Sequence, residues 1–196
     1  MISDKDTLDT LEEENLSNLE KNTTQMLKLT QFLPDNNTQF SNLVSLYLME
    51  IIYNDSLKKE YKNKLKKQKN SVFTSKFTPK ISIGDFVNKI IKFTKTSEST
   101  FILGLIYINK FCKLNDVILT DYNTHRIFLT AILLAKKYNE DNFYSNKFFS
   151  KVCGIKLKDL NVMEYNFLID ISFDLYVKNT IVKHFQEKIL NQKNII

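Results

Sequence analysis

Apolar residues recur at helical spacing along most of the chain, whereas residues 1–39 are polar and acidic with few leucines. The first helical pattern predicts a helix over about 41–57, which either ends there or continues through the basic run at 58–69. Its apolar positions lie on one face: Leu43, Val44, Leu46, Tyr47, Leu48, Ile51 and Tyr53. We therefore expect a tail without a fixed fold at 1–39, and an N-terminal helix with a basic linker at 40–70.

The next pattern opens with capping chemistry. Ser82 is a good N-cap, and Asp85 stands three residues later as a variant of the capping box, so a helix should run to about Thr94. The run FILGLIYINKF that follows is apolar on almost every side, which is typical of a helix in the middle of a bundle. Gly104 in this run costs up to ~1 kcal/mol of helix stability, which favours a close helix crossing at that point.

Three more helices complete the predicted bundle. Polar residues at 120–123 can cap a mostly buried helix, whose apolar stripe is Ile127, Ala131, Leu134 and Tyr138. We expect Asn146 to cap a short helix that Gly154 closes. Apolar residues three and four apart then predict another helix through Leu157, Leu160, Met163, Phe167 and Ile171. The sequence thus predicts an all-α bundle of five helices at 71–177, with the second and third most buried, followed by a C-terminal helix and tail at 178–196.

Composition favours helices over strands, because the 196 residues include only 3 Gly and 2 Pro. The net charge of +6 is uneven: residues 1–20 hold seven acids and one lysine, and residues 58–69 hold seven lysines and one glutamate. Such a basic run can meet phosphates or act as a nuclear address, but we interpret it as a solvated helix end and linker. The acidic N-terminus predicts no signal peptide, and the lack of an 18-residue apolar run predicts no membrane span.

Side chains that could carry chemistry are few and scattered. Cys112 and Cys153 are isolated, without a CxxC pair, which fits a reducing compartment and a role as small buried residues. His125 lacks the further ligands that a metal site needs, and His184 stands alone in the last helix. No motif supports a Cys–His nucleophilic pair. We therefore expect no catalytic residue, no metal and no cofactor.

Several sequence motifs resemble those of the P/U-type cyclins, a family with a single cyclin box. The motifs are TPKISIGDFVNKIIKFT, LGLIYINKF, LTDYNTHRIFLTAILLAKKY, EDNFYSNKFFSKV and GIKLKDLNVMEYNFL, and they cover roughly 79–177. The resemblance implies a five-helix cyclin box at 71–177, with an additional N-terminal helix and a C-terminal helix. Asn-Lys at 109–110 replaces the family's usual Asp-Arg, which implies a weaker ion pair between helices. Arg126 is expected to bridge carbonyls or a carboxylate between helices.

The same resemblance implies a non-catalytic regulatory subunit that binds a cyclin-dependent serine/threonine protein kinase and activates it by pressing the kinase's C helix inward. In the family, a lysine at the end of the third helix and a glutamate in the fifth bond to the kinase backbone; by position these are Lys137 and Glu164. Lys136 competes with Lys137, because the doubled lysine blurs the register. An acid near Asp141 can pair with a kinase arginine in place of a phosphate, and Glu140 can substitute for it.

Two other classes of function stay open. Cyclin folds also occur in transcription factors of the IIB type, so a nucleic-acid adaptor is the alternative, supported by the lysines at 58–69. A helical hydrolase or transferase would need a catalytic constellation that the sequence does not display. We expect an intracellular protein, in the cytoplasm or the nucleus, whose partner is a protein kinase. Neither a small-molecule substrate nor a membrane is expected, and nucleic acid is the less favoured partner.

Overall fold

The computed structural model describes residues 36–191, so the predicted N-terminal tail lies outside the described residues up to residue 35. Within this range the chain forms helices and no strand, which confirms the predicted all-α fold. The helices are α2 Asn36–Ser56, α3 Tyr61–Gln68, α4 Ile83–Thr94, α5 Glu98–Asn115, α6 Thr124–Asn139, α7 Asn146–Cys153, α8 Leu157–Asp170 and α9 Asn179–Asn191.

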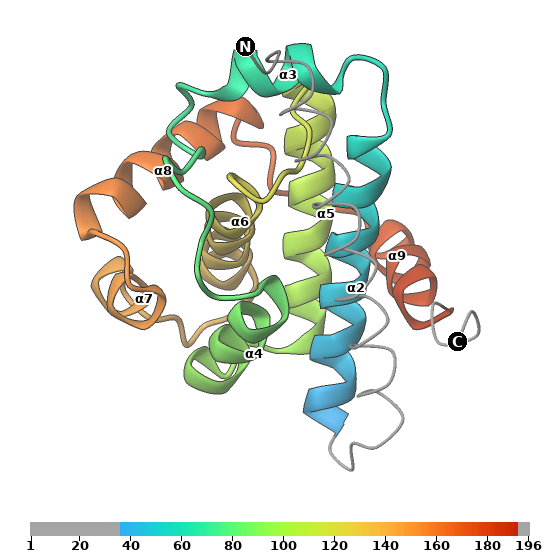
Figure 1. The fold of residues 1–196 in the computed structure, drawn as a ribbon. Coiled ribbons are helices and arrows are strands. Elements are labelled where there is room, and N and C mark those ends of the chain that lie inside the picture. The colour runs from blue at the N-terminus through green and yellow to red at the C-terminus, as the bar shows by residue number, and fades with distance from the viewer. Residues whose placement is uncertain (1–35, 192–196) are drawn as a thin grey trace, which may run out of the picture.

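Helix α6 lies in the centre of the bundle and is surrounded by α4, α5, α7 and α8 (Figure 1). Helix α2 packs along α4, and α9 contacts both α2 and α5 on the outer side of the bundle. Helix α3 crosses the end of the bundle at which α5 ends (Figure 1). Helices α4 to α8 are the five that the apolar pattern predicts, and α5 and α6 carry the longest runs of buried residues, as expected.

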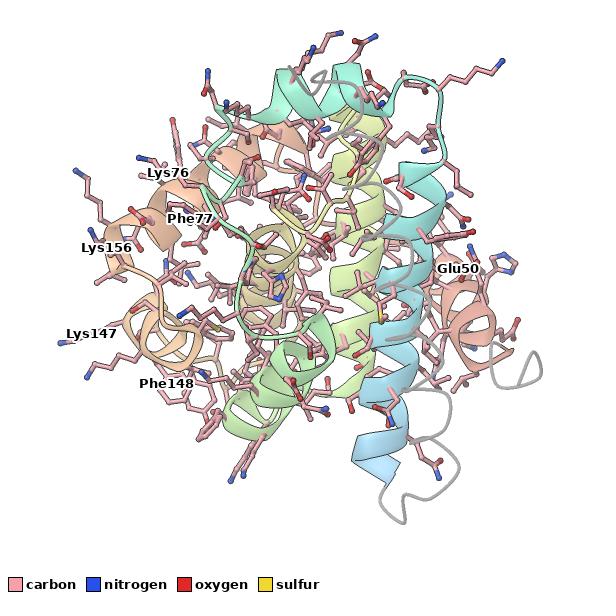
Figure 2. All side chains as sticks on the ribbon, in the orientation of Figure 1. Glu50, Lys76, Phe77, Lys147, Phe148 and Lys156 are labelled. Carbon is pink, nitrogen blue, oxygen red and sulfur yellow. The ribbon has the colours of Figure 1, made fainter. Side chains whose placement is uncertain are left out.

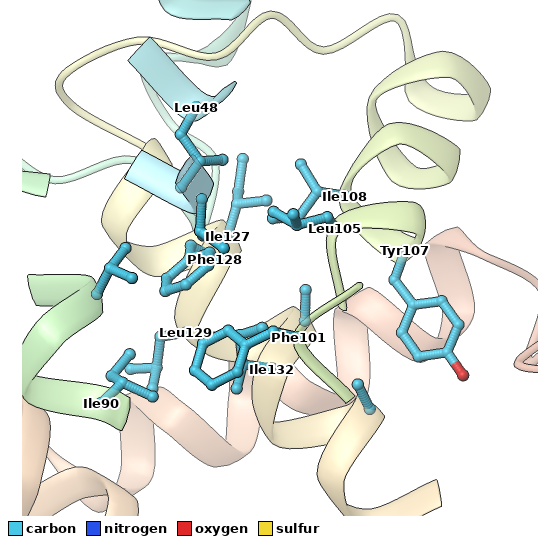
Figure 3. Close-up of a cluster of buried hydrophobic side chains, with 14 of the residues drawn as sticks. Leu48, Ile90, Phe101, Leu105, Tyr107, Ile108, Ile127, Phe128, Leu129 and Ile132 are labelled. Carbon is cyan, nitrogen blue, oxygen red and sulfur yellow. The ribbon is translucent and has the colours of Figure 1, made fainter. Parts of the chain in front are cut away.

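The core forms where α2, α4, α5 and α6 meet, and Figure 3 shows its central side chains. Its members are almost inaccessible to solvent: Leu48, Ile90, Phe101, Leu105, Ile108, Ile127, Phe128 and Ile132. Burying one such side chain contributes roughly 1.5–3 kcal/mol. Gly104 lies at the α5–α6 crossing, where an added methyl group would come within 2.5 Å of Cδ1 of Ile132. The close crossing that this glycine predicts is therefore confirmed.

Side-chain capping bonds fix the starts of α4, α5 and α7, and the residue predicted to cap α7 is wrong. Ser82 accepts the Asp85 N–H at 3.0 Å, as the capping box predicts. The Asp85 carboxylate accepts the Ser82 hydroxyl at 2.7 Å, whereas a standard box uses the N-cap backbone N–H. At α7 the N-cap is Ser145 rather than Asn146, because the Ser145 hydroxyl accepts the N–H of Phe148 at 3.3 Å. Asn146 becomes the first residue of α7, which releases its side chain for contacts with α8.

Two further expectations need correction. Tyr138 is half exposed, because it lies in the last turn of α6, beyond the neighbours that bury the rest of its stripe. Arg126 donates from Nε to the sulfur of Met163 at 3.2 Å, rather than bridging carbonyls or a carboxylate among the described residues. The weaker ion pair expected at 109–110 stays a prediction; Lys110 pairs with Asp174, which follows α8.

Candidate functional site

Lys137, Glu164 and Asn146 come together where α6, α7 and α8 converge. Lys137 in the last turn of α6 places Nζ 2.6 Å from Oε1 of Glu164, in the middle of α8. The Lys137 side chain is 30% exposed and the Glu164 side chain 17%. The resemblance to the cyclins implies that Lys137 and Glu164 each contact the kinase, and the structure joins the two residues in an ion pair. An ammonium has three donors and a carboxylate about four lone-pair positions, so the pair keeps bonding capacity for a partner.

Asn146 holds the glutamate in place from the start of α7. Its Nδ2 donates to Oε2 of Glu164 at 2.6 Å and to Oδ1 of Asn161 at 2.8 Å. Glu164 is therefore held on both carboxylate oxygens, by an ammonium on one side and an amide on the other. Sequence reasoning missed this role, because Asn before an apolar run is a standard capping signal. The neighbouring Ser145 is an equally good N-cap, and its presence indicates that the Asn146 side chain could be available for another contact.

Lys136 has different surroundings from Lys137. Its side chain is only 2% exposed, and its ammonium pairs with the carboxylate of Glu140 and lies 5.7 Å from the centre of the Tyr144 ring. The other oxygen of Glu140 accepts the backbone N–H of Ser97 at 3.0 Å and the Ser97 hydroxyl at 3.1 Å. Lys136 and Glu140 thus tie the end of α6 to the start of α5.

The pKa of Glu140 reports this arrangement. Partial burial alone would raise it, but the Lys136 ammonium and the hydrogen bonds from Ser97 and Thr100 outweigh burial and leave the pKa below its ordinary value. Asp141, the next residue, is exposed in the turn after α6. The structure therefore places Asp141 at the surface, close in sequence to Lys137, with Glu140 turned toward the start of α5.

Exposed apolar side chains lie on α8 and in the turn before α7. On α8 they are Val162, Tyr165 and Ile169, which lie three and four residues apart and so form one stripe, roughly 130° around the helix from Glu164. Phe143 in the turn before α7 is also more than half exposed. Lys147 of α7 points away from the body of the bundle (Figure 2). Exposed aromatic and aliphatic groups are among the residue types enriched at protein-binding surfaces.

Catalytic or metal chemistry gains no support from the described residues. Among residues 36–191, no group of three or more His, Cys, Asp or Glu side chains is placed to hold a metal ion. Burial raises the pKa of the Cys112 thiol and of the Cys153 thiol to about 12, which disfavours the nucleophilic thiolate. No helix in the described part of the chain is long and apolar enough to cross a membrane.

Comparison with known proteins identifies the family. A family model for cyclins matches residues 54–175, more than half of the chain. Cyclin-U2-1 of Arabidopsis thaliana is 34% identical over 120 residues, covering 60% of this chain and 53% of that protein. Cyclin-P4-1 of Oryza sativa subsp. japonica is 36% identical over 108 residues, covering 55% of this chain and 51% of that protein. Cyclin-P3-1 of the same rice is 30% identical over 146 residues, covering 72% and 61%.

The chain belongs to the cyclin family. Within that family it is a P/U-type cyclin, since its relatives carry the names of plant P- and U-type cyclins. The resemblance of the sequence motifs to the P/U-type cyclins is thereby confirmed. The chain spans about half the length of the curated relatives it matches. Family membership supports a regulatory role.

Proposed function

We propose that this protein is the regulatory subunit of a cyclin-dependent serine/threonine protein kinase, which it binds and activates without catalytic groups of its own. The single observation that carries the proposal is the Lys137–Glu164 ion pair, held by Asn146 at the partly exposed meeting point of α6, α7 and α8. These are the positions at which the resemblance to the cyclins implies kinase contacts. We place the cyclin box at 71–177 and the protein inside the cell, in the cytoplasm or the nucleus.

The polar centre suits recognition of backbone groups. Lys137 can donate to a kinase carbonyl, and Glu164 can accept from a kinase N–H, while each keeps its bond to the other. Because Asn146 fixes the carboxylate before the partner arrives, less side-chain freedom is lost on binding. Charged groups arranged in this way determine the register of an interface more than its total affinity.

Exposed apolar side chains can supply area that the polar pair cannot. Val162, Tyr165 and Ile169 project from α8 on a face roughly 130° around the helix from Glu164, and Tyr is among the residue types that dominate binding energy at interfaces. A kinase that contacts both faces of α8 would bury this stripe in addition to the ion pair. We expect an interface of standard size or larger, above roughly 1,600 Å².

Lys136 and Asp141 receive different roles in this proposal. Lys136 is buried and paired with Glu140, so we assign it to positioning the end of α6 rather than to direct contact. Asp141 is exposed in the following turn, where its carboxylate can reach a kinase arginine. The predicted set of four residues thus divides into three contact residues and one supporting residue.

The test is affinity capture of the tagged chain from an extract of its native cells, followed by mass spectrometry and a protein-kinase assay on the eluate. The proposal predicts a cyclin-dependent kinase in stoichiometric amount, with kinase activity that depends on the chain. The double variant Lys137→Ala/Glu164→Ala should lose the kinase while keeping its helical content. The matched control is Lys178→Ala/Glu187→Ala, which also removes one exposed charge of each sign, at α9.

Two outcomes would contradict the proposal. If no kinase is captured and polymerase or promoter-bound factors are found instead, the nucleic-acid adaptor becomes the better reading. If a kinase is captured equally by the double variant and its control, the function stands but the site is wrong.

A further inference from the structure

A pocket beside α3 lies apart from the proposed kinase-docking site. It has a volume of about 360 Å³ and lies between α3, the segment after it, the end of α5 and the start of α6. Its lining is mixed: the apolar part includes the buried Phe73, Phe111 and Ile127, and the rest is polar, with Lys64 and Lys67 of α3 and the acid Asp116 among it. Figure 1 shows α3 across the top of the bundle and α7, the helix that carries Asn146, at its lower left.

The basic charge around this pocket is only partly compensated within the fold. Lys58 lies 2.5 Å from the carboxylate of Asp55, and Lys64 lies 2.5 Å from that of Asp116. Four exposed lysines have no ion pair with another residue of the range 36–191: Lys59, Lys66, Lys67 and Lys69. A basic surface next to a pocket that is apolar in part fits a partner that is acidic and carries some apolar side chains.

Residues 1–20 of the same chain have that chemistry. They hold seven acids and one lysine, a formal charge of −6, against the +6 of residues 58–69 with their seven lysines and one glutamate. They also contain four leucines, at positions 8, 11, 16 and 19. We propose that the acidic segment 1–20 docks on α3, with its carboxylates on the free lysines and leucine side chains in the pocket.

The chain is long enough for this contact. Helix α2 begins at Asn36, at its end away from α3 (Figure 1), and its 21 residues span about 31 Å. Residues 21–35 can extend over as much as roughly 50 Å, which exceeds the length of α2. A segment tethered in this way has an effective concentration in the millimolar range, so even a weak contact would be populated. The contact is independent of kinase binding, and it would cover lysines that a phosphate-bearing partner would otherwise meet.

Zero-length carbodiimide cross-linking of the full chain tests the contact, because it joins only carboxylates and amines that touch. In the monomer fraction, mass spectrometry should find links from the acids of segment 1–20 to Lys66 and Lys67. Lys178 and Lys183, which are exposed at α9, serve as reference amines and should not be linked. Raising the salt to ~0.5 M shortens the screening length and should reduce the links about fivefold.

A charge variant sharpens the test. Glu12→Gln/Glu13→Gln should reduce the links formed by Asp4, Asp6 and Asp9 by about threefold, since the segment's attraction to α3 falls. The control Glu98→Gln/Glu187→Gln removes two exposed acids elsewhere and should leave these links unchanged.

The proposal is overturned if no links to α3 form, if the reference lysines are linked equally, or if the links occur only between two chains. Duplex DNA binding gives a separate check. If the chain binds duplex DNA, loses it in Lys66→Gln/Lys67→Gln and is unaffected by Glu12→Gln/Glu13→Gln, phosphates rather than the acidic segment occupy α3.

Discussion

Lys136 and Lys137 are neighbours in the sequence, and each pairs with a glutamate, yet their surroundings differ. Lys136 is 2% exposed and pairs with Glu140 at the end of its own helix, whereas Lys137 is 30% exposed and reaches across to Glu164 on α8. Successive residues of a helix point about 100° apart, so two adjacent lysines face different neighbours. Burial, rather than residue type, therefore separates a lysine that supports the fold from one that can meet a partner.

The Lys136–Glu140 pair should show the largest effect, on the free energy of unfolding. Glu140→Ala leaves the buried Lys136 ammonium without its carboxylate and removes the acceptor of Ser97, so we expect a loss of about 3 kcal/mol in the free energy of unfolding. Urea denaturation followed by circular dichroism measures it. Lys136→Met added to Glu140→Ala should recover at least half of the loss, because no charge is then buried unpaired. A loss below about 1 kcal/mol for Glu140→Ala would show that the pair does not support the fold.

The Lys137–Glu164 pair should affect kinase affinity rather than stability. Glu164→Gln keeps the size of the side chain but removes the charge that faces Lys137, so we expect kinase affinity to fall by about 2 kcal/mol, roughly 30-fold. The free energy of unfolding should change by less than about 1 kcal/mol, since the pair is partly exposed. Titration calorimetry with the purified kinase measures the affinity. Unchanged affinity would remove Glu164 from the interface.

Asn146 tests whether holding the Glu164 carboxylate in place before binding raises the affinity for the kinase. Asn146→Ala frees one oxygen of Glu164, and we expect kinase affinity to fall by about 1 kcal/mol. The effect should vanish in the Glu164→Gln background, because Asn146 acts through that carboxylate. A double-mutant cycle on kinase affinity measures this coupling. Additive losses would mean that Asn146 contacts the kinase independently or affects only the fold.

The smallest expected effect is a dependence on pH. The folded state holds the pKa of Glu140 below its ordinary value of 4.5, so its contribution to stability is complete above pH 4.5 and is lost as the pH falls through the folded pKa. Glu140→Gln should therefore flatten the decline of stability below pH 4.5, when unfolding by urea is compared across the acid range. An unchanged slope would indicate that Glu140 is not held ionised by Lys136.

The sequence predicts the helices well and the site only in part. Apolar spacing is enough to find α4, α5, α6 and α8, because each buries a continuous face. The choice between Lys136 and Lys137 could not be made from spacing, since both lie in the last turn of α6 and only the packing of α8 separates them. The contact between Asn146 and Glu164 could not be predicted from the sequence either, because an asparagine at this position can cap its own helix or contact another helix with the same side chain.

The role of the basic run was equally undetermined. It forms its own helix, α3, and lines a pocket with residues more than forty positions away, such as Phe111 and Ile127. Local charge predicts a solvated surface but carries no information about a pocket assembled from distant segments. The acids at 1–20 and the lysines at 58–69 were visible in the sequence, and the fold supplies the pocket that suggests they meet.

The most direct test of the account compares Lys136→Met with Lys137→Met, the same substitution at adjacent positions, by kinase affinity and by urea unfolding. The account predicts a crossed result: Lys137→Met loses at least about tenfold in affinity and keeps its stability within ~1 kcal/mol. Lys136→Met loses about 1–2 kcal/mol of stability and keeps its affinity within about threefold. Equal losses of affinity in the two variants, or a larger loss for Lys136→Met, would contradict the assignment of Lys137 to the kinase and Lys136 to the fold.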